Sequence, residues 1–170
     1  MYKRQVWKGV SIEPPVKWFR SEHPNVEAMT KREEDTKRLQ YGIEIWAIGE
    51  NRSRETPKPV DSFEEAFIPD WAEKVLRSRS YDKPTSIQIQ AWSAASLGYD
   101  MLAIACTGSG KTMAYTLPML QHVTAQQEVK PGQGPIGLIL VPSRELSNKL
   151  VRKSKAYFLR HGIRRVSTAD

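Results

Sequence analysis

An eight-residue glycine-rich loop sets the strongest limit on how this chain can fold. Residues 105–112 read Ala-Cys-Thr-Gly-Ser-Gly-Lys-Thr, which matches the pattern G-x-x-x-x-G-K-[S/T] with Ala105 in place of the first glycine. The loop lies between an apolar run, residues 101–105, and a helix-like segment that begins near Gly110. An ordinary glycine-rich turn is the alternative interpretation, but strand, loop and helix in this order are the context of a phosphate-binding loop.

The residue types of this loop match the chemistry of a nucleotide phosphate site. Small residues let successive backbone N–H groups wrap the phosphates, and the following helix presents its positive N-terminus to them. In this pattern Lys111 reaches the β- and γ-phosphates, and the hydroxyl of Thr112 ligates Mg²⁺. We therefore expect ATP and Mg²⁺ as ligands. The expected contacts come from Thr107, Gly108, Ser109, Gly110, Lys111 and Thr112.

The order of elements after residue 60 predicts an α/β fold. Continuous apolar runs at 101–105 and 136–141 indicate buried parallel strands, and a third strand is expected to begin at Ile163. Helices alternate with these strands, which is the order of a doubly wound sheet. The helices are expected at 31–40, from Pro69, at 86–97, from Gly110 and from Ser143.

Residues 1–60 are predicted to form an irregular, partly disordered N-terminal arm. Prolines interrupt it, and charges of both signs are mixed along it. Thr30 followed by Glu33 is a capping-box signature for a short helix, and alternation over 43–48 predicts a short strand. The rest of the chain is predicted to comprise residues 61–89, which contain a further motif described below, and residues 90–170, which form the first part of an ATP-binding domain.

Two further motifs flank the glycine-rich loop in the sequence, one before it and one after it. Pro84-Thr85-Ser86-Ile87-Gln88 precedes Lys111 by 23 residues, and a glutamine can pair with N6 and N7 of adenine. Pro142-Ser143-Arg144-Glu145 opens the last helix, where a helix N-terminus and an arginine can bind nucleic-acid phosphates. For each motif alone the alternative is a plain capped helix, and for the motif that ends at Gln88 this helix-start interpretation is favoured when it is taken alone.

A local excess of positive charge follows the second of these motifs. The net charge of +7 is equalled by seven basic residues between Leu146 and Ala169, a stretch without an acidic residue. Four of them share a helical face: Lys149, Arg152, Lys153 and Arg160. Such a stripe favours a polyanion such as nucleic acid, with a solvated helix face as the alternative.

Taken together, the three motifs resemble those of the DEAD-box ATP-dependent RNA helicases over about residues 20–170. In that family an isolated aromatic residue lies upstream of the Q motif, which reads aromatic-x-x-Pro-Thr-x-Ile-Gln. The residues at these positions in this chain are Phe63, Tyr81, Pro84, Thr85, Ile87 and Gln88. The family usually has alanine at the position of Ala105. Its next motif usually reads Pro-Thr-Arg-Glu-Leu-Ala, so Ser143 and Ser147 are departures that keep a small side chain.

The resemblance implies a fold, an activity and partners. The fold would be an incomplete recombinase-like phosphate-loop sheet, and the activity ATP hydrolysis coupled to RNA duplex unwinding or ribonucleoprotein remodelling. Lys111 and Thr112 would take part in catalysis, Phe63, Tyr81, Pro84 and Gln88 would bind the nucleotide base, and Pro142 to Glu145 would contact RNA. Protein partners within a ribonucleoprotein complex are expected. A non-catalytic nucleotide- or RNA-binding adaptor and a DNA-directed ATPase are the alternatives.

Composition limits the remaining possibilities. The longest apolar run is far shorter than a membrane span, and the lone Cys106 cannot form an internal disulfide. We expect an intracellular location, in the nucleus or cytoplasm, with the nucleus favoured. Because no Asp-Glu-Ala-Asp string follows, residues 1–170 alone are expected not to hydrolyse ATP. They are also expected not to fold robustly, because a doubly wound sheet needs more strands than the two complete apolar runs provide.

Overall fold

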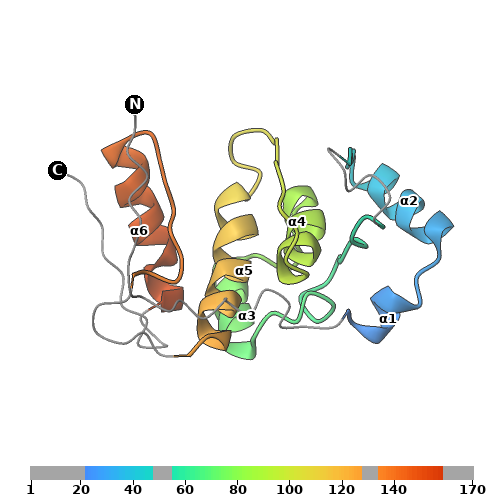
Figure 1. Ribbon diagram of the computed structural model, residues 1–170, viewed down its shortest axis with the longest axis horizontal. Coiled ribbons are helices and arrows are strands. Elements are labelled where there is room, and N and C mark those ends of the chain that lie inside the picture. Colours follow the sequence, from blue (N-terminus) through green and yellow to red (C-terminus); the bar gives the residue numbers. More distant parts are fainter. Residues whose placement is uncertain (1–21, 48–54, 128–133, 159–170) are drawn as a thin grey trace, which may run out of the picture.

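The computed structural model describes residues 22–47, 55–127 and 134–158, and within these ranges the regular structure is helical. Helices α3, α4 and α5 lie at the centre, with α6 at one end and the pair α1 and α2 at the other (Figure 1). The helices are α1 (Pro24–Glu27), α2 (Lys31–Gln40), α3 (Asp70–Arg77), α4 (Ser86–Ser96), α5 (Lys111–Ala125) and α6 (Arg144–Phe158). No helix in the described ranges is long and apolar enough to cross a membrane.

Side-chain caps fix the start of the arm helices. In α2 the carboxylate of Glu33 accepts from the backbone N–H of Thr30 at 2.8 Å, and the Thr30 hydroxyl accepts from the Glu33 N–H at 3.4 Å. This is the predicted capping box. Helix α1 was not predicted: Pro24 occupies its first turn, and the His23 ring accepts from the Asn25 N–H at 3.2 Å.

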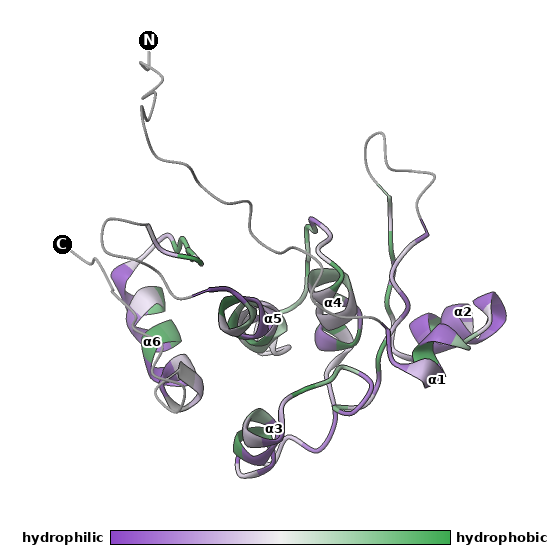
Figure 2. Ribbon diagram, turned by 60° about the horizontal axis from the view of Figure 1, so that its bottom comes forward, coloured by the Kyte–Doolittle hydropathy of each residue, from purple (hydrophilic) through white to green (hydrophobic). Residues whose placement is uncertain are grey.

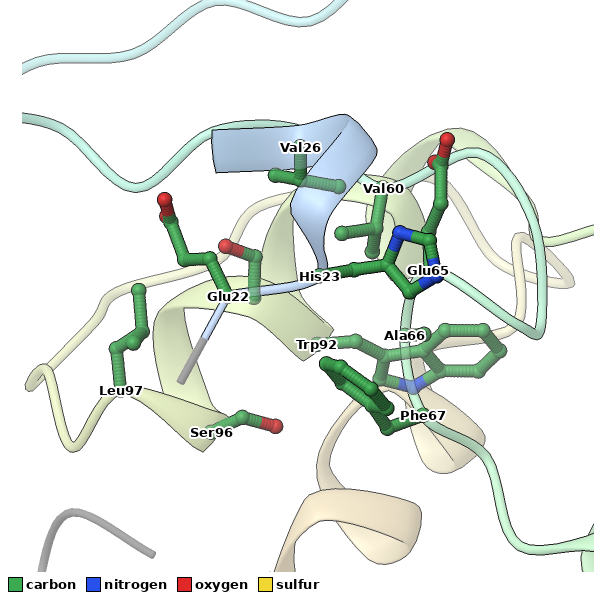
Figure 3. Close-up of a pocket in the computed structure, with 11 residues that line it drawn as sticks. Glu22, His23, Val26, Val60, Glu65, Ala66, Phe67, Trp92, Ser96 and Leu97 are labelled. Atoms are coloured by element: carbon green, nitrogen blue, oxygen red, sulfur yellow. The ribbon is translucent and has the colours of Figure 1, made fainter. Parts of the chain in front are cut away.

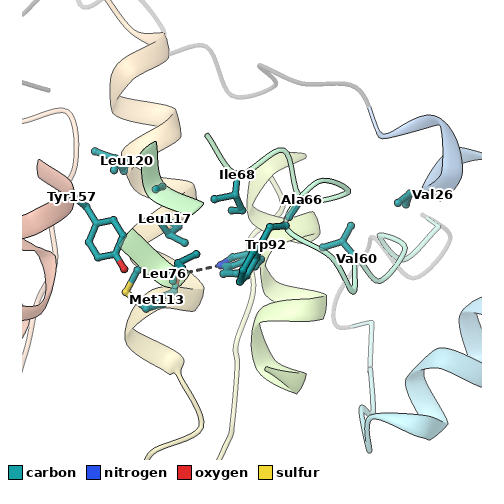
Figure 4. Close-up of a cluster of buried hydrophobic side chains, with 12 residues drawn as sticks. Val26, Val60, Ala66, Ile68, Leu76, Trp92, Met113, Leu117, Leu120 and Tyr157 are labelled. Carbon is teal, nitrogen blue, oxygen red and sulfur yellow. Dashed lines mark hydrogen bonds between the residues drawn. The ribbon is translucent and has the colours of Figure 1, made fainter. Parts of the chain in front are cut away.

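The hydrophobic core surrounds Trp92 of α4. Trp92 is buried, and its indole N–H donates to the Met113 carbonyl of α5 at 3.1 Å, which joins the two central helices (Figure 4). Leu117 and Leu120 of α5 and Leu76 of α3 are also buried in this cluster. In Figure 2 the apolar parts of α4 and α5 lie at the centre of the molecule, whereas α2 is mostly hydrophilic.

The strands predicted at 101–105 and 136–141 are not formed, and neither is the strand predicted over the described part of 43–48. The leucines of these two runs and Ile104 are instead exposed: 81% for Leu102, 87% for Ile104, 70% for Leu138 and 84% for Leu140, whereas Ile136 and Ile139 are half-buried. A strand requires hydrogen bonds to a neighbouring strand, and none of the described residues supplies one. The strand expected from Ile163, like the first 21 residues of the arm, lies outside the described residues.

Candidate functional site

The glycine-rich loop has the backbone conformation that its sequence requires. Gly108 and Gly110 have φ angles of +88° and +90°, a region that residues with a side chain rarely adopt. The Ser109 N–H donates to the Cys106 carbonyl at 3.3 Å and closes the turn. Helix α5 begins directly after Gly110, so the loop leads into a helix N-terminus, as predicted.

Gln88 joins helix α4 to this loop. Its side chain is only 3% exposed; the amide oxygen accepts from the Thr85 N–H at 3.0 Å, and the amide nitrogen donates to the Gly110 carbonyl at 3.2 Å. A Cβ at Gly110 would lie 2.6 Å from that nitrogen. The sequence predicted a base-recognition role for Gln88 but missed this bridge. Its position three residues after the N-cap Thr85 was the available signal.

Lys111 holds the first turn of the loop together. Its ammonium group donates to the carbonyl oxygens of Ala105 and Cys106, at 2.5 Å and 2.7 Å. The hydroxyl of Ser109 is buried without a hydrogen-bond partner among the described residues. An unpartnered buried donor, a lysine and a helix N-terminus in one loop suit an anionic phosphate group. Thr112 is half-buried at the first turn of α5.

An open pocket of about 540 Å³ lies beside the segment that leads to Gln88. Phe63, Arg77, Asp82 and Lys83 are among its lining residues. Phe63 is only 4% exposed, with its ring 6.1 Å from the Trp92 ring and 5.7 Å from the Arg77 guanidinium group. Its stacking on a base stays a prediction.

The other two residues predicted to bind the base differ in exposure. Tyr81 is 42% exposed and is not among the residues that line this pocket, whereas Pro84 is buried. The structure therefore brings Gln88 to the loop directly and places Phe63 on the wall of the neighbouring pocket.

The start of α6 is capped as the sequence predicted. The Ser143 hydroxyl accepts from the Leu146 N–H at 3.3 Å, and its carbonyl accepts from the Ser147 N–H at 3.1 Å. The four residues of the predicted RNA contact are all exposed: Pro142, Ser143, Arg144 and Glu145. Of the basic stripe, Lys149, Arg152 and Lys153 are exposed, and Arg160 lies outside the described residues.

Helix α6 is anchored near the segment that precedes the glutamine motif. The Arg79 guanidinium group donates to the Lys153 carbonyl at 3.3 Å and lies 5.5 Å from the ring of Tyr157. Tyr157 is buried, and its ring is 6.3 Å from that of Trp71 in an edge-on arrangement. Burial raises the pKa of Tyr157, and the nearby positive charge of Arg79 opposes that shift.

The site has no preformed metal cluster in the described ranges. No group of three or more His, Cys, Asp or Glu side chains there is arranged to hold a metal ion.

Comparison with known proteins identifies the family. The DEAD/DEAH box helicase profile matches residues 85–169. The chain is 39% identical over 145 residues to the ATP-dependent RNA helicase dbp2 of Aspergillus clavatus, a match that covers 85% of this chain and 25% of that protein. It is 43% identical over 141 residues to DBP2 of Lodderomyces elongisporus, covering 83% and 24%. The chain thus spans about a quarter of the length of these relatives.

Solved helicase structures share the arrangement of the chain. The RNA helicase Prp28 of Chaetomium thermophilum, crystallised with ADP, superposes with a TM-score of 0.71 at 30% identity, over 89% of this chain and 35% of that one. The yeast DEAD-box splicing factor Prp28 has the same fold, with a TM-score of 0.68 at 24% identity, over 81% of this chain and 31% of its own. With its glycine-rich loop, the glutamine motif and the capped helix that follows them, this chain belongs to the DEAD/DEAH box helicase family.

Proposed function

We propose that this chain binds adenine nucleotide and RNA as part of an ATP-dependent RNA helicase. The observation that carries the proposal is the hydrogen bond from Gln88 to the Gly110 carbonyl, which joins the expected base-recognition residue to the expected phosphate loop. The names of the relatives and the ADP in the Prp28 crystal support the same assignment.

The loop residues would act by charge and by backbone geometry. The Lys111 ammonium group, held at the loop by two carbonyls, is placed to compensate the negative charge of a bound phosphate chain. The loop N–H groups and the N-terminus of α5 add positive potential at the same place. When Mg²⁺ is bound, it supplies further charge compensation for phosphoryl transfer, and the hydroxyl of Thr112 would be its ligand in this chain.

Base recognition would fall to the helix-start segment of α4. The amide nitrogen of Gln88 has a second hydrogen, and its oxygen has a second lone pair, beyond the two bonds it makes within the protein. These positions match the donor and acceptor of the adenine edge, whereas guanine presents a different pattern; because Gln88 is only 3% exposed, the amide would have to become accessible when the base binds. The pocket beside Phe63 is large enough to receive a base.

RNA would be held at the start of α6 and along its basic stripe. The helix N-terminus at Ser143 and the exposed Arg144 offer contacts to phosphates, and Lys149, Arg152 and Lys153 extend the positive surface along α6. Contacts of this kind give binding that depends on salt and little on sequence.

The proposal is tested by the affinity of the protein for ADP and GDP, measured by calorimetry. We expect preference for ADP, loss of most affinity for both nucleotides in Lys111→Ala, and a loss confined mainly to ADP in Gln88→Ala, of about tenfold. Lys74→Ala and Gln127→Ala, which replace exposed residues elsewhere, are the matched controls and should bind as the unaltered protein does. Equal affinity for ADP and GDP in the unaltered protein, or normal binding by Lys111→Ala, would contradict the proposal.

A further inference from the structure

A buried arginine on α2, Arg38, is central to the attachment of the N-terminal arm to the helicase part of the chain. The side chain of Arg38, on α2, is 9% exposed, and it pairs with the buried carboxylate of Glu34 at 3.0 Å and with Asp35 at 3.3 Å. These pairs lie within α2 itself. Both pairs use the same terminal nitrogen of the guanidinium group. Because the group has five N–H donors, its other nitrogens remain available to further acceptors.

The remaining donors of Arg38 reach outside the arm helix. Its Nε donates to the amide oxygen of Gln90 on α4 at 3.3 Å, and one terminal nitrogen donates to the Pro57 carbonyl at 3.1 Å. The amide nitrogen of Gln90 donates to the same Pro57 carbonyl at 2.6 Å. Arg38, Gln90 and Pro57 thus form a closed triangle of hydrogen bonds that joins α2, α4 and the segment between them.

This triangle lies on the opposite side of α4 from the phosphate loop. Residues separated by two positions in a helix are about 200° apart around its axis, so Gln88 and Gln90 point in nearly opposite directions. Gln90 faces the arm and Gln88 faces Gly110. The first turns of α4 are therefore held between the arm on one side and the phosphate loop on the other.

A second set of contacts ties the arm to the wall of the pocket. Lys37, next to Arg38, pairs with Asp61 at 3.0 Å, and Asp61 lines the same pocket as Phe63. The Val60 N–H donates to the Ile89 carbonyl of α4 at 3.0 Å. The arm thus contacts both structures that carry the base-binding residues: helix α4 and the segment around Phe63.

Apolar contacts from α1 complete the attachment. Val26 and His23 of the arm lie over Val60 and Trp92, around a cavity of about 30 Å³ (Figure 3). The His23 ring is 5.4 Å from that of Phe67. This cavity is too small for more than about one water molecule, so we interpret it as a packing space and not as a ligand site.

We propose that Arg38 is a positioning residue for the nucleotide site. By fixing Gln90 and Pro57, it sets the position of α4 and so holds the Gln88 amide against the Gly110 carbonyl. The effect on nucleotide affinity rests on the function proposed above, whereas the effect on the loop does not. Substitution of a side chain that supports a binding group in this way commonly changes the affinity for the ligand, although the side chain does not touch the ligand.

Arg38→Lys is the sharpest variant, because it removes the reach without removing the charge. A lysine keeps the pair with the buried Glu34, so the arm helix retains its compensated carboxylate, but it has no planar fork to bind Gln90 and Pro57 together. Arg38→Met is the second variant and removes every donor. Arg32→Lys, on an exposed position of the same helix, is the matched control.

The experiment measures amide hydrogen exchange in the full chain without nucleotide, and then its affinity for ADP and GDP. We expect Arg38→Lys to exchange faster than the unaltered protein at the start of α4 and in residues 107–112. We expect it to bind ADP about fivefold more weakly, with a smaller loss for GDP, which shares the phosphate-loop contacts but not the adenine contact. Arg38→Met should show larger changes of the same kind. Arg32→Lys should show neither change.

Two results would overturn the inference. One is exchange in residues 107–112 that is unchanged in both Arg38 variants, because the arm would then not reach the loop. The other is faster exchange spread evenly over all helices, which indicates a purely structural role. If the unaltered protein itself shows no preference for ADP, the proposed function fails, and the exchange data still decide whether Arg38 positions the loop.

Discussion

At the scale of single residues, Gln88 and Gly110 restrict each other. Gly110 has a φ angle of +90°, and a Cβ there would meet the Gln88 amide nitrogen at 2.6 Å and the Thr85 hydroxyl at 2.9 Å. A side chain at this position therefore suffers both backbone strain and a close contact. Because Gln88 is fixed by two hydrogen bonds, it cannot move away without breaking the link between α4 and the loop.

Gly110→Ala should therefore reduce ADP affinity by more than tenfold and lower the melting temperature. One control variant separates the causes: Gly42→Ala replaces a glycine with a φ angle of +61° outside the nucleotide site, and its Cβ meets no atom within 4 Å. It should cost only backbone strain, about 1 kcal/mol or somewhat more. Calorimetric binding and thermal unfolding of the two variants check this. If Gly42→Ala lost as much ADP affinity as Gly110→Ala, the contact with Gln88 would not be the cause.

The raised pKa of Tyr157 predicts how the free energy of unfolding changes at alkaline pH. Burial raises the pKa of Tyr157 above the value of about 10 found in unfolded chains. The folded state therefore retains the phenol proton when the unfolded state begins to lose it, so this contribution is complete below about pH 10 and is lost as the pH rises further. Tyr157→Phe should lose less stability than the unaltered protein between pH 9 and pH 11 in urea unfolding. Parallel loss in the two proteins would show that Tyr157 is not the group involved.

The site residues show what sequence can predict at this scale. The loop residues could be predicted because a phosphate loop depends on local backbone conformation, and Gly108 and Gly110 have the positive φ angles that glycine readily adopts. The hydrogen bond between Gln88 and Gly110 could not, since it joins residues 22 positions apart through the packing of two helices. Arg38 gave no signal in the sequence at all, because its partners Gln90 and Pro57 become neighbours only in the folded chain.

At the scale of elements, five of the six helices in the described residues were predicted, all except α1, whereas the predicted strands are not confirmed there. The predicted starts of α2, α4 and α6 are confirmed, because a capping side chain acts within one turn of its own helix. No comparable short-range interaction fixes the conformation of the apolar runs 101–105 and 136–141. Their strand conformation depends on hydrogen bonds to a partner strand, which the described residues do not contain.

Helix α6 carries the prediction about RNA. Reversing Lys149, Arg152 and Lys153 to glutamate should weaken binding of single-stranded RNA by at least tenfold at about 0.1 M salt, with a smaller difference at higher salt. The helix should stay in place, because Arg79 binds the backbone carbonyl of Lys153 and not its side chain. Fluorescence anisotropy with a labelled oligonucleotide measures the affinity. Reversal of Arg32 and Lys74, which are exposed on other helices, is the control, and equal RNA binding by both variants would restore the interpretation of α6 as a solvated face.

At the scale of the whole molecule, the helices do not cover the exposed apolar side chains of the runs 101–105 and 136–141. The core around Trp92 buries the inner sides of α3, α4 and α5, yet Leu102, Ile104, Leu138 and Leu140 are each at least 70% exposed. Apolar side chains in extended segments with unpaired backbone groups favour association, since contact between copies both buries apolar surface and satisfies N–H and C=O groups.

Residues 1–170, expressed as an isolated polypeptide, should therefore self-associate as concentration increases. Replacing Leu102 and Leu140 with lysine should reduce this association, because each substitution places a charge on one of the two runs. Leu39 is the matched control: it is 84% exposed, but it lies on α2, whose other residues are mostly hydrophilic. Sedimentation velocity over a range of concentrations measures the change. If Leu39→Lys reduced association as much as the double variant, general surface hydrophobicity would be the cause, and the two extended runs would not be the sites of contact.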